Sequence, residues 1–175
     1  MRAYLLFLPS TLLGVVGLVI LYFRPLALEP RVGVAMSLVA AFALTGFFFI
    51  AAWLLERVSP SFRYAEKLLQ RALARVYITL PLAFVFAALS ALAEELFFRA
   101  ALLPLIGVWG QAALFGLLHP APRKAWVYTL FTFVAGLGLG YLTLFTGRLY
   151  PAVLVHFAVN LQGFLELRRK RGHKD

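Results

Sequence analysis

The chain has no cysteine, few acids and a single asparagine. Without cysteine, disulfide bonds, thiolate metal ligands and thiol nucleophiles are all excluded from its 175 residues. Polar groups of any kind are scarce, since 63% of the residues are hydrophobic and the mean hydropathy is +0.89. A soluble domain is only about half apolar. These values exclude an ordinary soluble domain and indicate a protein that crosses a membrane several times.

Six apolar runs predict an all-α fold, a polytopic transmembrane helical bundle of about six membrane segments around a buried polar site. A helix needs about 20 residues to cross a bilayer. The run 76–106 exceeds this length, and the run 108–119 falls short of it. The first run begins after Arg2 and lacks a cleavage site, so we expect it to be retained as a helix. The runs cover residues 3–23, 32–55, 76–106, 108–119, 125–146 and 149–165.

Three parts of the chain differ in composition. We expect residues 1–75 to form two transmembrane helices and a basic amphipathic helix, residues 76–167 a helical core, and residues 168–175 a basic cytoplasmic tail. Within residues 56–75, apolar residues recur at helical spacing after Ser59, a capping hydroxyl that is followed by a proline in the first turn. This pattern favours a helix lying on an anionic membrane surface, and the alternative is a solvated loop.

Basic residues set the expected orientation. A net charge of +10 would suggest a nucleic-acid partner in a soluble protein, but here the cations lie in short segments between apolar runs, so no nucleic acid is expected. If both termini and residues 56–75 and 120–124 share one side, that side holds 13 of the 17 Lys and Arg residues. The positive-inside rule makes this side cytoplasmic. We therefore expect an integral protein of the plasma membrane, surrounded by the lipid bilayer, with N- and C-termini in the cytoplasm.

Polar side chains inside the apolar runs are few and costly. An ionisable group at bilayer depth opposes insertion by about 2.5–3.5 kcal/mol. Counted at about 1.5 Å per residue from expected turns near Gly107 and Gly147, three groups of polar residues lie roughly 14–19 Å inward, near the middle of a ~30 Å core. A chain that buries such groups at one depth is expected to use them in chemistry. The residues are Glu94, Glu95, Arg99, His119, His156 and Asn160.

The two adjacent glutamates predict two different roles. Glu95 and Arg99 are four residues apart, so they can form an ion pair on one face of a helix. Glu94 points about 100° away from its neighbour and has no partner within that helix. It is therefore a candidate general base for a water molecule, a task that His119 from another helix can share. Taken alone, the Glu95–Arg99 pair is more typical of a structural ion pair.

His156 and Asn160 are also four residues apart and share a helical face. Their N–H donors can bind a developing oxyanion, which completes the parts of a hydrolase that activates water directly. Each motif has a structural alternative, because a lone membrane histidine often bonds across helices and a histidine–asparagine pair can clamp two helices together. The three motifs together, in this order and at one depth, favour the catalytic interpretation.

The three motifs, Glu-Glu-x-x-x-Arg, Phe-x-x-x-His and His-x-x-x-Asn, are similar to the signature of the CPBP family. These are the CAAX-protease and bacteriocin-processing intramembrane proteases, also called the Abi family. The flanking sequences match as well, at Glu94–Arg99, Leu114–Pro120 and Thr146–Ala152. The resemblance covers about residues 90–165, and it departs at Ala100, where the family often has glycine.

The resemblance implies an intramembrane endopeptidase whose substrates are proteins or peptides at the membrane, with residues 76–167 as the catalytic core. Glu94 and His119 would activate the water molecule. His156 and Asn160 would stabilise the tetrahedral oxyanion, and the ion pair would support the site. We expect no cofactor. If the reaction depends on a metal, Zn²⁺ or another divalent metal would be held by Glu94, His119 and His156.

Two other functions stay open at this point. A non-enzymatic membrane regulator or immunity protein could use the same fold to bind a partner. A small proton-coupled transporter is the third alternative, since buried Glu and His side chains also serve in proton relays. All six signature residues are present, which favours the endopeptidase, and no internal repeat of the kind found in transporters is visible.

Overall fold

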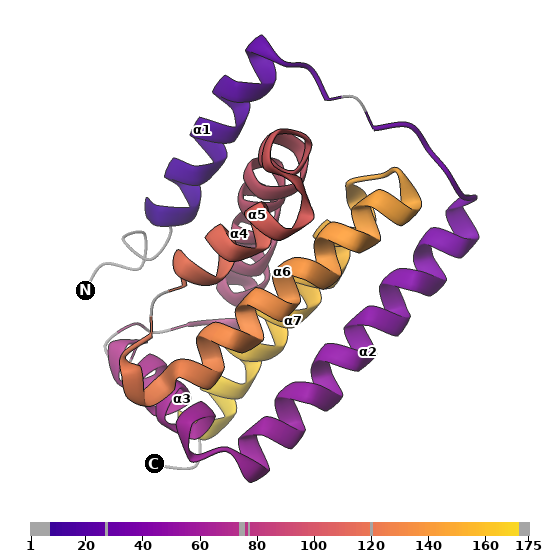
Figure 1. The fold of residues 1–175 in the computed structure, drawn as a ribbon. Helices are drawn as coiled ribbons and strands as arrows, with labels where there is room; N and C mark the ends of the chain where they lie inside the picture. The colour runs from indigo at the N-terminus through magenta and orange to yellow at the C-terminus, as the bar shows by residue number, and fades with distance from the viewer. Residues whose placement is uncertain (1–7, 27, 74–75, 77, 120, 172–175) are drawn as a thin grey trace.

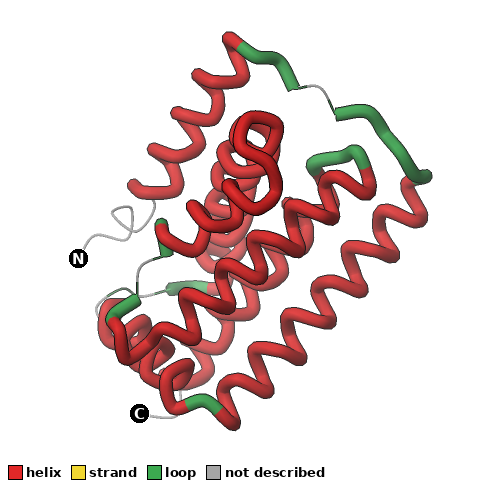
Figure 2. Tube along the Cα trace, viewed as in Figure 1, coloured by secondary structure: helices red, strands yellow, loops and turns green. Residues whose placement is uncertain are grey.

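The structure is a computed structural model that describes residues 8–26, 28–73, 76, 78–119 and 121–171. Within these ranges the regular elements are helices and no strand occurs (Figure 1, Figure 2). The predicted all-α helical bundle is therefore confirmed. Arg2, Arg75 and residues 172–175 carry part of the predicted charge asymmetry and lie outside the described residues.

Several helices have the length and composition of membrane spans. In the described part of the chain, three are long and apolar enough to cross a bilayer: Val34–Val58, Leu80–Leu117 and Arg123–Thr146. A shorter apolar helix covers Leu8–Phe23. The long stretch Leu80–Leu117 combines most of the two central apolar runs, whose lengths did not fit single spans. These helices support the assignment to an integral membrane protein.

Helices α1 (Leu8–Phe23), α2 (Val34–Val58) and α3 (Pro60–Leu73) form the N-terminal part. Helix α3 begins at the predicted cap, where the Phe62 backbone N–H donates to the Ser59 hydroxyl at 3.2 Å. The Phe62 ring is buried, with its centroid 5.6 Å from that of Phe131. The segment is thus a packed helix rather than a solvated loop, and its contact with a membrane surface stays a prediction.

The C-terminal part contains the segments that carry the polar motifs. A first-turn cap starts it, because the Leu82 backbone N–H donates to the Thr79 hydroxyl at 3.3 Å. The elements that follow are α4 (Leu80–Glu95), the π-helical turn η2 (Leu96–Leu102), α5 (Leu103–Leu117), the short 3₁₀ turn η3 (Arg123–Ala125), α6 (Trp126–Thr146) and α7 (Tyr150–Arg171).

Gly107 reverses the chain within the long central stretch. Its φ is +72° and its ψ 176°, a combination outside the helical region that glycine adopts readily. Glu94 lies 13 residues before Gly107 and His119 lies 12 residues after it, so a reversal here returns both to one level. Gly147 ends α6 with a left-handed φ of +61°, as is common for a helix C-terminus. Both expected turns are therefore present.

The remaining helices enclose the ones that carry the motifs. Helix α4 packs against α7, and α5 packs against α6. Helix α1 packs on α4 and η2, whereas α2 packs on α7 from the opposite side of the bundle (Figure 1). Helix α3 lies across the ends of this bundle and contacts α6 and η3 (Figure 1). Part of the core is a cluster formed by Ala41, Phe48, Leu139, Leu142, Ala152 and Val155.

Candidate functional site

Glu94 lies close to both His119 and His156. It lies at the end of α4, His119 follows α5, and His156 is on α7. The Glu94 Oε2 atom is 3.7 Å from His119 Nε2 and 3.8 Å from His156 Nε2. Glu94 and His156 are each 6% exposed, whereas the His119 side chain is 27% exposed. The structure therefore brings together three residues that are distant in sequence and places His119 nearest to solvent.

The ring orientation of His119 is set by its own helix. Its Nδ1 atom is 2.7 Å from the Phe115 carbonyl oxygen, one helical turn earlier. Because a carbonyl can only accept, Nδ1 carries the proton, and the Nε2 atom of the neutral ring is left as an acceptor. The Phe115 ring also lies against both imidazoles, with centroids 4.5 Å from His119 and 5.7 Å from His156. The motif spacing of four residues thus fixes the imidazole that faces Glu94.

Glu95 holds two basic groups through one oxygen. Its Oε1 atom accepts from Arg99 Nη1 at 2.7 Å and from His156 Nδ1 at 2.8 Å. Glu95 and Arg99 are both fully buried. The expected pair four residues apart is therefore present, and it has a third member from α7. Through this contact the pair fixes the ring of His156, whose opposite nitrogen faces Glu94.

Arg99 also ties the site to α6. Its Nη2 atom donates to the Gly136 carbonyl at 3.3 Å, and the buried Gln111 donates to the same oxygen at 2.9 Å. Arg99 lies in η2, a π-helical turn. Such turns are rare in proteins overall, but those that occur are often at functional sites. Gln111 was not singled out in the sequence because it carries no charge and belongs to none of the three motifs. The signal that could have identified it is the presence of a polar residue within the apolar run 108–119.

Asn160 lies one turn after His156 on α7 and bonds to α4. Its Nδ2 atom donates to the Ser90 hydroxyl at 3.0 Å. Ser90 in turn donates to the Phe86 carbonyl of its own helix at 2.8 Å. An asparagine amide has two N–H groups, so one is left for another acceptor. Ser90 precedes Glu94 by one helical turn, which is a spacing that could have included it among the candidates.

The contact between Ser10 and Glu94 was not predicted from the sequence at all. The Ser10 hydroxyl donates to the second oxygen of the Glu94 carboxylate, Oε1, at 2.7 Å. Ser10 belongs to α1, in the part of the chain that carries none of the three motifs. The two residues are 84 positions apart, so no local spacing connects them. Glu94 therefore has a partner from another helix, although it has none within its own.

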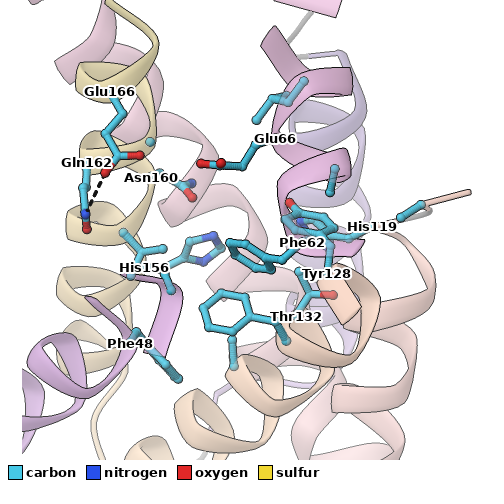
Figure 3. A pocket seen from close by; sticks show the side chains of 18 of the residues that line it. Phe48, Phe62, Glu66, His119, Tyr128, Thr132, His156, Asn160, Gln162 and Glu166 are labelled. Carbon is cyan, nitrogen blue, oxygen red and sulfur yellow. Dashed lines mark hydrogen bonds between the residues drawn. The ribbon is translucent and has the colours of Figure 1, made fainter. Parts of the chain in front are cut away.

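Six of these polar side chains line a cavity of about 720 Å³, namely Ser10, Ser90, Glu94, His119, His156 and Asn160. Its size falls within the range of ligand-binding clefts, roughly 300–1,000 Å³. Figure 3 shows His156 and Asn160 along the cavity, with Glu66 of α3 and Glu166 of α7 toward the same end. Most of the lining is apolar and aromatic, and it includes Phe48, Phe62, Tyr128, Phe131 and Leu139. The polar residues of the three motifs thus face a mostly apolar space, which also carries polar side chains such as Glu66 and Thr132 on its other sides.

The residues expected to hold a metal, if one is needed, are Glu94, His119 and His156. Among the residues that the structure describes, no group of three His, Cys, Asp or Glu side chains is placed to hold a metal ion. In the expected set, a single Glu94 oxygen faces both histidines, and the other oxygen accepts from Ser10. Zinc ligands lie about 2.0–2.2 Å from the ion, so neighbouring ligands of a tetrahedral site are roughly 3.3–3.6 Å apart, slightly less than the 3.7 and 3.8 Å between these atoms. The mechanism proposed below uses the side chains alone, and metal dependence is tested separately.

Comparison with known proteins identifies the segment that carries the site. A family model described as Rce1-like, type II CAAX prenyl endopeptidase, matches residues 75–162, which is half of the chain. The matched segment contains all six polar residues singled out in the sequence. The resemblance to CAAX proteases is thus confirmed. No curated protein matches the chain, and no solved structure does so either.

Proposed function

The chain belongs to the Rce1-like family of type II CAAX prenyl endopeptidases, and from this premise we propose a residue-level mechanism for peptide-bond hydrolysis within the membrane. Family membership makes the chain a membrane protease that acts on a protein or peptide substrate. The observation that carries the proposal is the meeting of the Glu94 carboxylate with two imidazoles at the wall of the cavity. Each step below assigns one task to one of these groups.

Glu94 and His119 activate the attacking water. The 3.7 Å between Glu94 Oε2 and His119 Nε2 is too long for a direct hydrogen bond, which spans about 2.7–3.2 Å. A water molecule on the cavity side of the two atoms can bridge them and donate one proton to each. The water oxygen attacks the scissile carbonyl as one of its protons passes to Glu94, and Glu94 later gives that proton to the leaving amine. The carboxylate thereby acts first as a base and then as an acid.

His156 and Asn160 stabilise the negative charge that develops on the carbonyl oxygen. Asn160 contributes the N–H group that Ser90 leaves unused. His156 already donates its Nδ1 proton to Glu95, so it donates from Nε2 only when the ring carries two protons. Donors aimed at such an oxyanion are typically worth about 10²–10³ in kcat.

The Glu95–Arg99 pair supports the site without touching the substrate. Arg99 holds Glu95 at 2.7 Å, and Glu95 holds His156 at 2.8 Å. This chain of contacts keeps the His156 ring in the orientation in which Nε2 faces Glu94. We propose that its contribution to catalysis is positional, in the way that carboxylates orient catalytic or metal-binding histidines elsewhere.

The remaining expectations concern the cofactor and the membrane. We propose that hydrolysis needs no cofactor, with Zn²⁺ or another divalent metal as the alternative that chelation tests. We also propose that the protein lies in the plasma membrane with both termini cytoplasmic. Lys67 and Arg71, the exposed basic residues of α3, would then face the anionic cytoplasmic surface. The cavity reaches α3, so its entrance would lie on the same side.

A reconstituted cleavage assay tests the proposal. The purified protein is placed in vesicles with two peptides of one sequence, one prenylated near its C-terminus and one unmodified. We expect cleavage by the wild type, and a loss of about 10²–10⁴-fold in Glu94→Gln and His119→Ala, the range for removing a general base. Glu29→Gln, an exposed glutamate remote from the cavity, is the matched control. Wild-type rates in either site variant would refute the mechanism.

A further inference from the structure

Helix α1 supplies a side chain to the site from outside the family segment. The Ser10 hydroxyl donates to Glu94 Oε1 at 2.7 Å, the short distance typical of a hydrogen bond to a carboxylate. The family model covers residues 75–162, so α1 lies wholly outside it. Ser10 also lines the cavity that contains the site. The first helix thus reaches the group that we propose as the base.

The two oxygens of Glu94 have separate surroundings. Oε1 accepts the Ser10 proton, whereas Oε2 faces His119 and His156. Within the described residues Oε2 has no hydrogen-bond partner of its own. The terminal torsion of a glutamate is soft, so a carboxylate held at neither oxygen would rotate freely. Because the two oxygens of a carboxylate are equivalent, the hydrogen bond at Oε1 matters by fixing the plane of the carboxylate, and with it the position of the oxygen that faces the histidines.

The docking face of α1 is built for close approach at this point. Ser10, Gly14 and Gly17 follow one another at helical spacing and lie on one face. A Cβ atom at Gly14 would come within 2.9 Å of Ala93 Cβ, and one at Gly17 within 2.9 Å of Phe97 Cα. Ala93 and Phe97 flank Glu94 on α4 and η2. The glycines thus let α1 approach closely enough for a serine hydroxyl to reach the carboxylate.

The other faces of α1 take no part in this contact. Leu12 is 63% exposed and Leu18 55% exposed, as expected for side chains that face lipid. Helix α1 makes its main contacts with α4 and η2. Its packing against the described part of the protein is therefore concentrated on the segment that carries Glu94, Glu95 and Arg99.

We propose that Ser10 is a positioning residue, which orients the Glu94 carboxylate so that Oε2 faces the two histidines and the attacking water. The inference rests on the proposed function of Glu94 as the base. It assigns to α1 a task in the reaction that the family segment alone does not contain. The hydroxyl does not touch the substrate, so its loss should slow the chemical step and leave substrate binding nearly unchanged.

The experiment compares the wild type with Ser10→Ala, Ser10→Thr and Thr11→Ala in vesicles, on a substrate that the wild type cleaves. Thr11 is the adjacent hydroxyl on the exposed side of α1, so it is the matched control. We expect Ser10→Ala to lower kcat about 10- to 100-fold with KM nearly constant, because a misplaced group costs up to ~10²-fold. Ser10→Thr, which keeps the hydroxyl, should restore most of the rate, and Thr11→Ala should equal the wild type.

Each other result overturns the inference in a distinct way. A Ser10→Ala enzyme with wild-type kcat would remove the positioning role and leave the proposed protease intact. Equal losses in Ser10→Ala and Ser10→Thr, or in Ser10→Ala and Thr11→Ala, would show a packing effect of α1 instead. A wild-type protein that cleaves no substrate would overturn the proposed function and this inference together.

Discussion

Arg99→Met is the substitution whose consequence follows most directly from the structure. Methionine keeps much of the side-chain length and helix propensity of arginine but removes the guanidinium. Glu95, which is fully buried, then loses its 2.7 Å partner. The Gly136 carbonyl loses one donor at 3.3 Å but keeps Gln111 at 2.9 Å. The main cost is therefore the uncompensated charge of Glu95.

The magnitude follows from the behaviour of buried ion pairs. Removing one partner of such a pair destabilises a protein by about 3–5 kcal/mol, because the other charge stays buried. His156 still donates to Glu95 at 2.8 Å, so we expect Arg99→Met to fall near the lower end, about 3 kcal/mol. Adding Glu95→Gln removes the stranded charge. The double variant should therefore be more stable than Arg99→Met alone.

The assay is the unfolding of each purified variant in detergent, followed by helical circular dichroism as temperature or denaturant rises. Arg24→Met, which changes an exposed arginine beyond the end of α1, should shift the free energy of unfolding by less than about 0.5 kcal/mol. Wild-type stability in Arg99→Met would refute the reasoning. So would a double variant whose loss equals the sum of the two single losses, since coupled neighbours are not expected to be additive.

Three further predictions concern a turn, the proposed oxyanion donor Asn160 and the cofactor. Gly147→Ala should destabilise the fold by more than about 1 kcal/mol, because its φ is +61° and a Cβ would collide with the Glu29 carbonyl. The control Gly46→Ala, with open space around the glycine, should be neutral or stabilising. A Gly147→Ala protein that unfolds at a higher temperature than Gly46→Ala would contradict this. Asn160→Leu should lower kcat by about 10²–10³-fold while KM changes little, and a selective rise in KM in steady-state kinetics would argue instead for substrate binding. Dialysis against a strong chelator should leave cleavage unchanged, and activity that is lost and then restored by Zn²⁺ would assign the carboxylate and imidazoles to a metal.

Local pattern was enough to predict the helices and the convergence of the motifs. Apolar runs predict the helices because a membrane helix needs a continuous apolar surface that faces either lipid or the protein core. The turns at Gly107 and Gly147 could be expected because each separates apolar runs, and both glycines have positive φ. Given a helical rise and two turns, the common level of Glu94, His119 and His156 follows from counting residues.

Contacts between distant segments could not be predicted in this way. The bond between His156 and Glu95 joins residues 61 positions apart, and the bond between Ser10 and Glu94 joins residues 84 apart. Such contacts depend on how helices pack, which no periodicity within one helix encodes. The π-helical turn after Glu95 was also not predicted, because its sequence continues the apolar run and carries no local signal that separates it from an α-helix. The spacing of the motifs indicated which polar residues lie together, and the packing of α1 and α7 decides which contacts they make.

The central claim is that this chain cleaves peptide bonds with Glu94 as the base. The most direct test compares the termini of membrane proteins in cells that produce the wild type and cells that produce Glu94→Ala at matched levels. The account predicts new peptide ends that occur only with the wild type, which would also name the substrates. Identical sets of termini in the two cell populations, with both proteins inserted in the membrane, would contradict it.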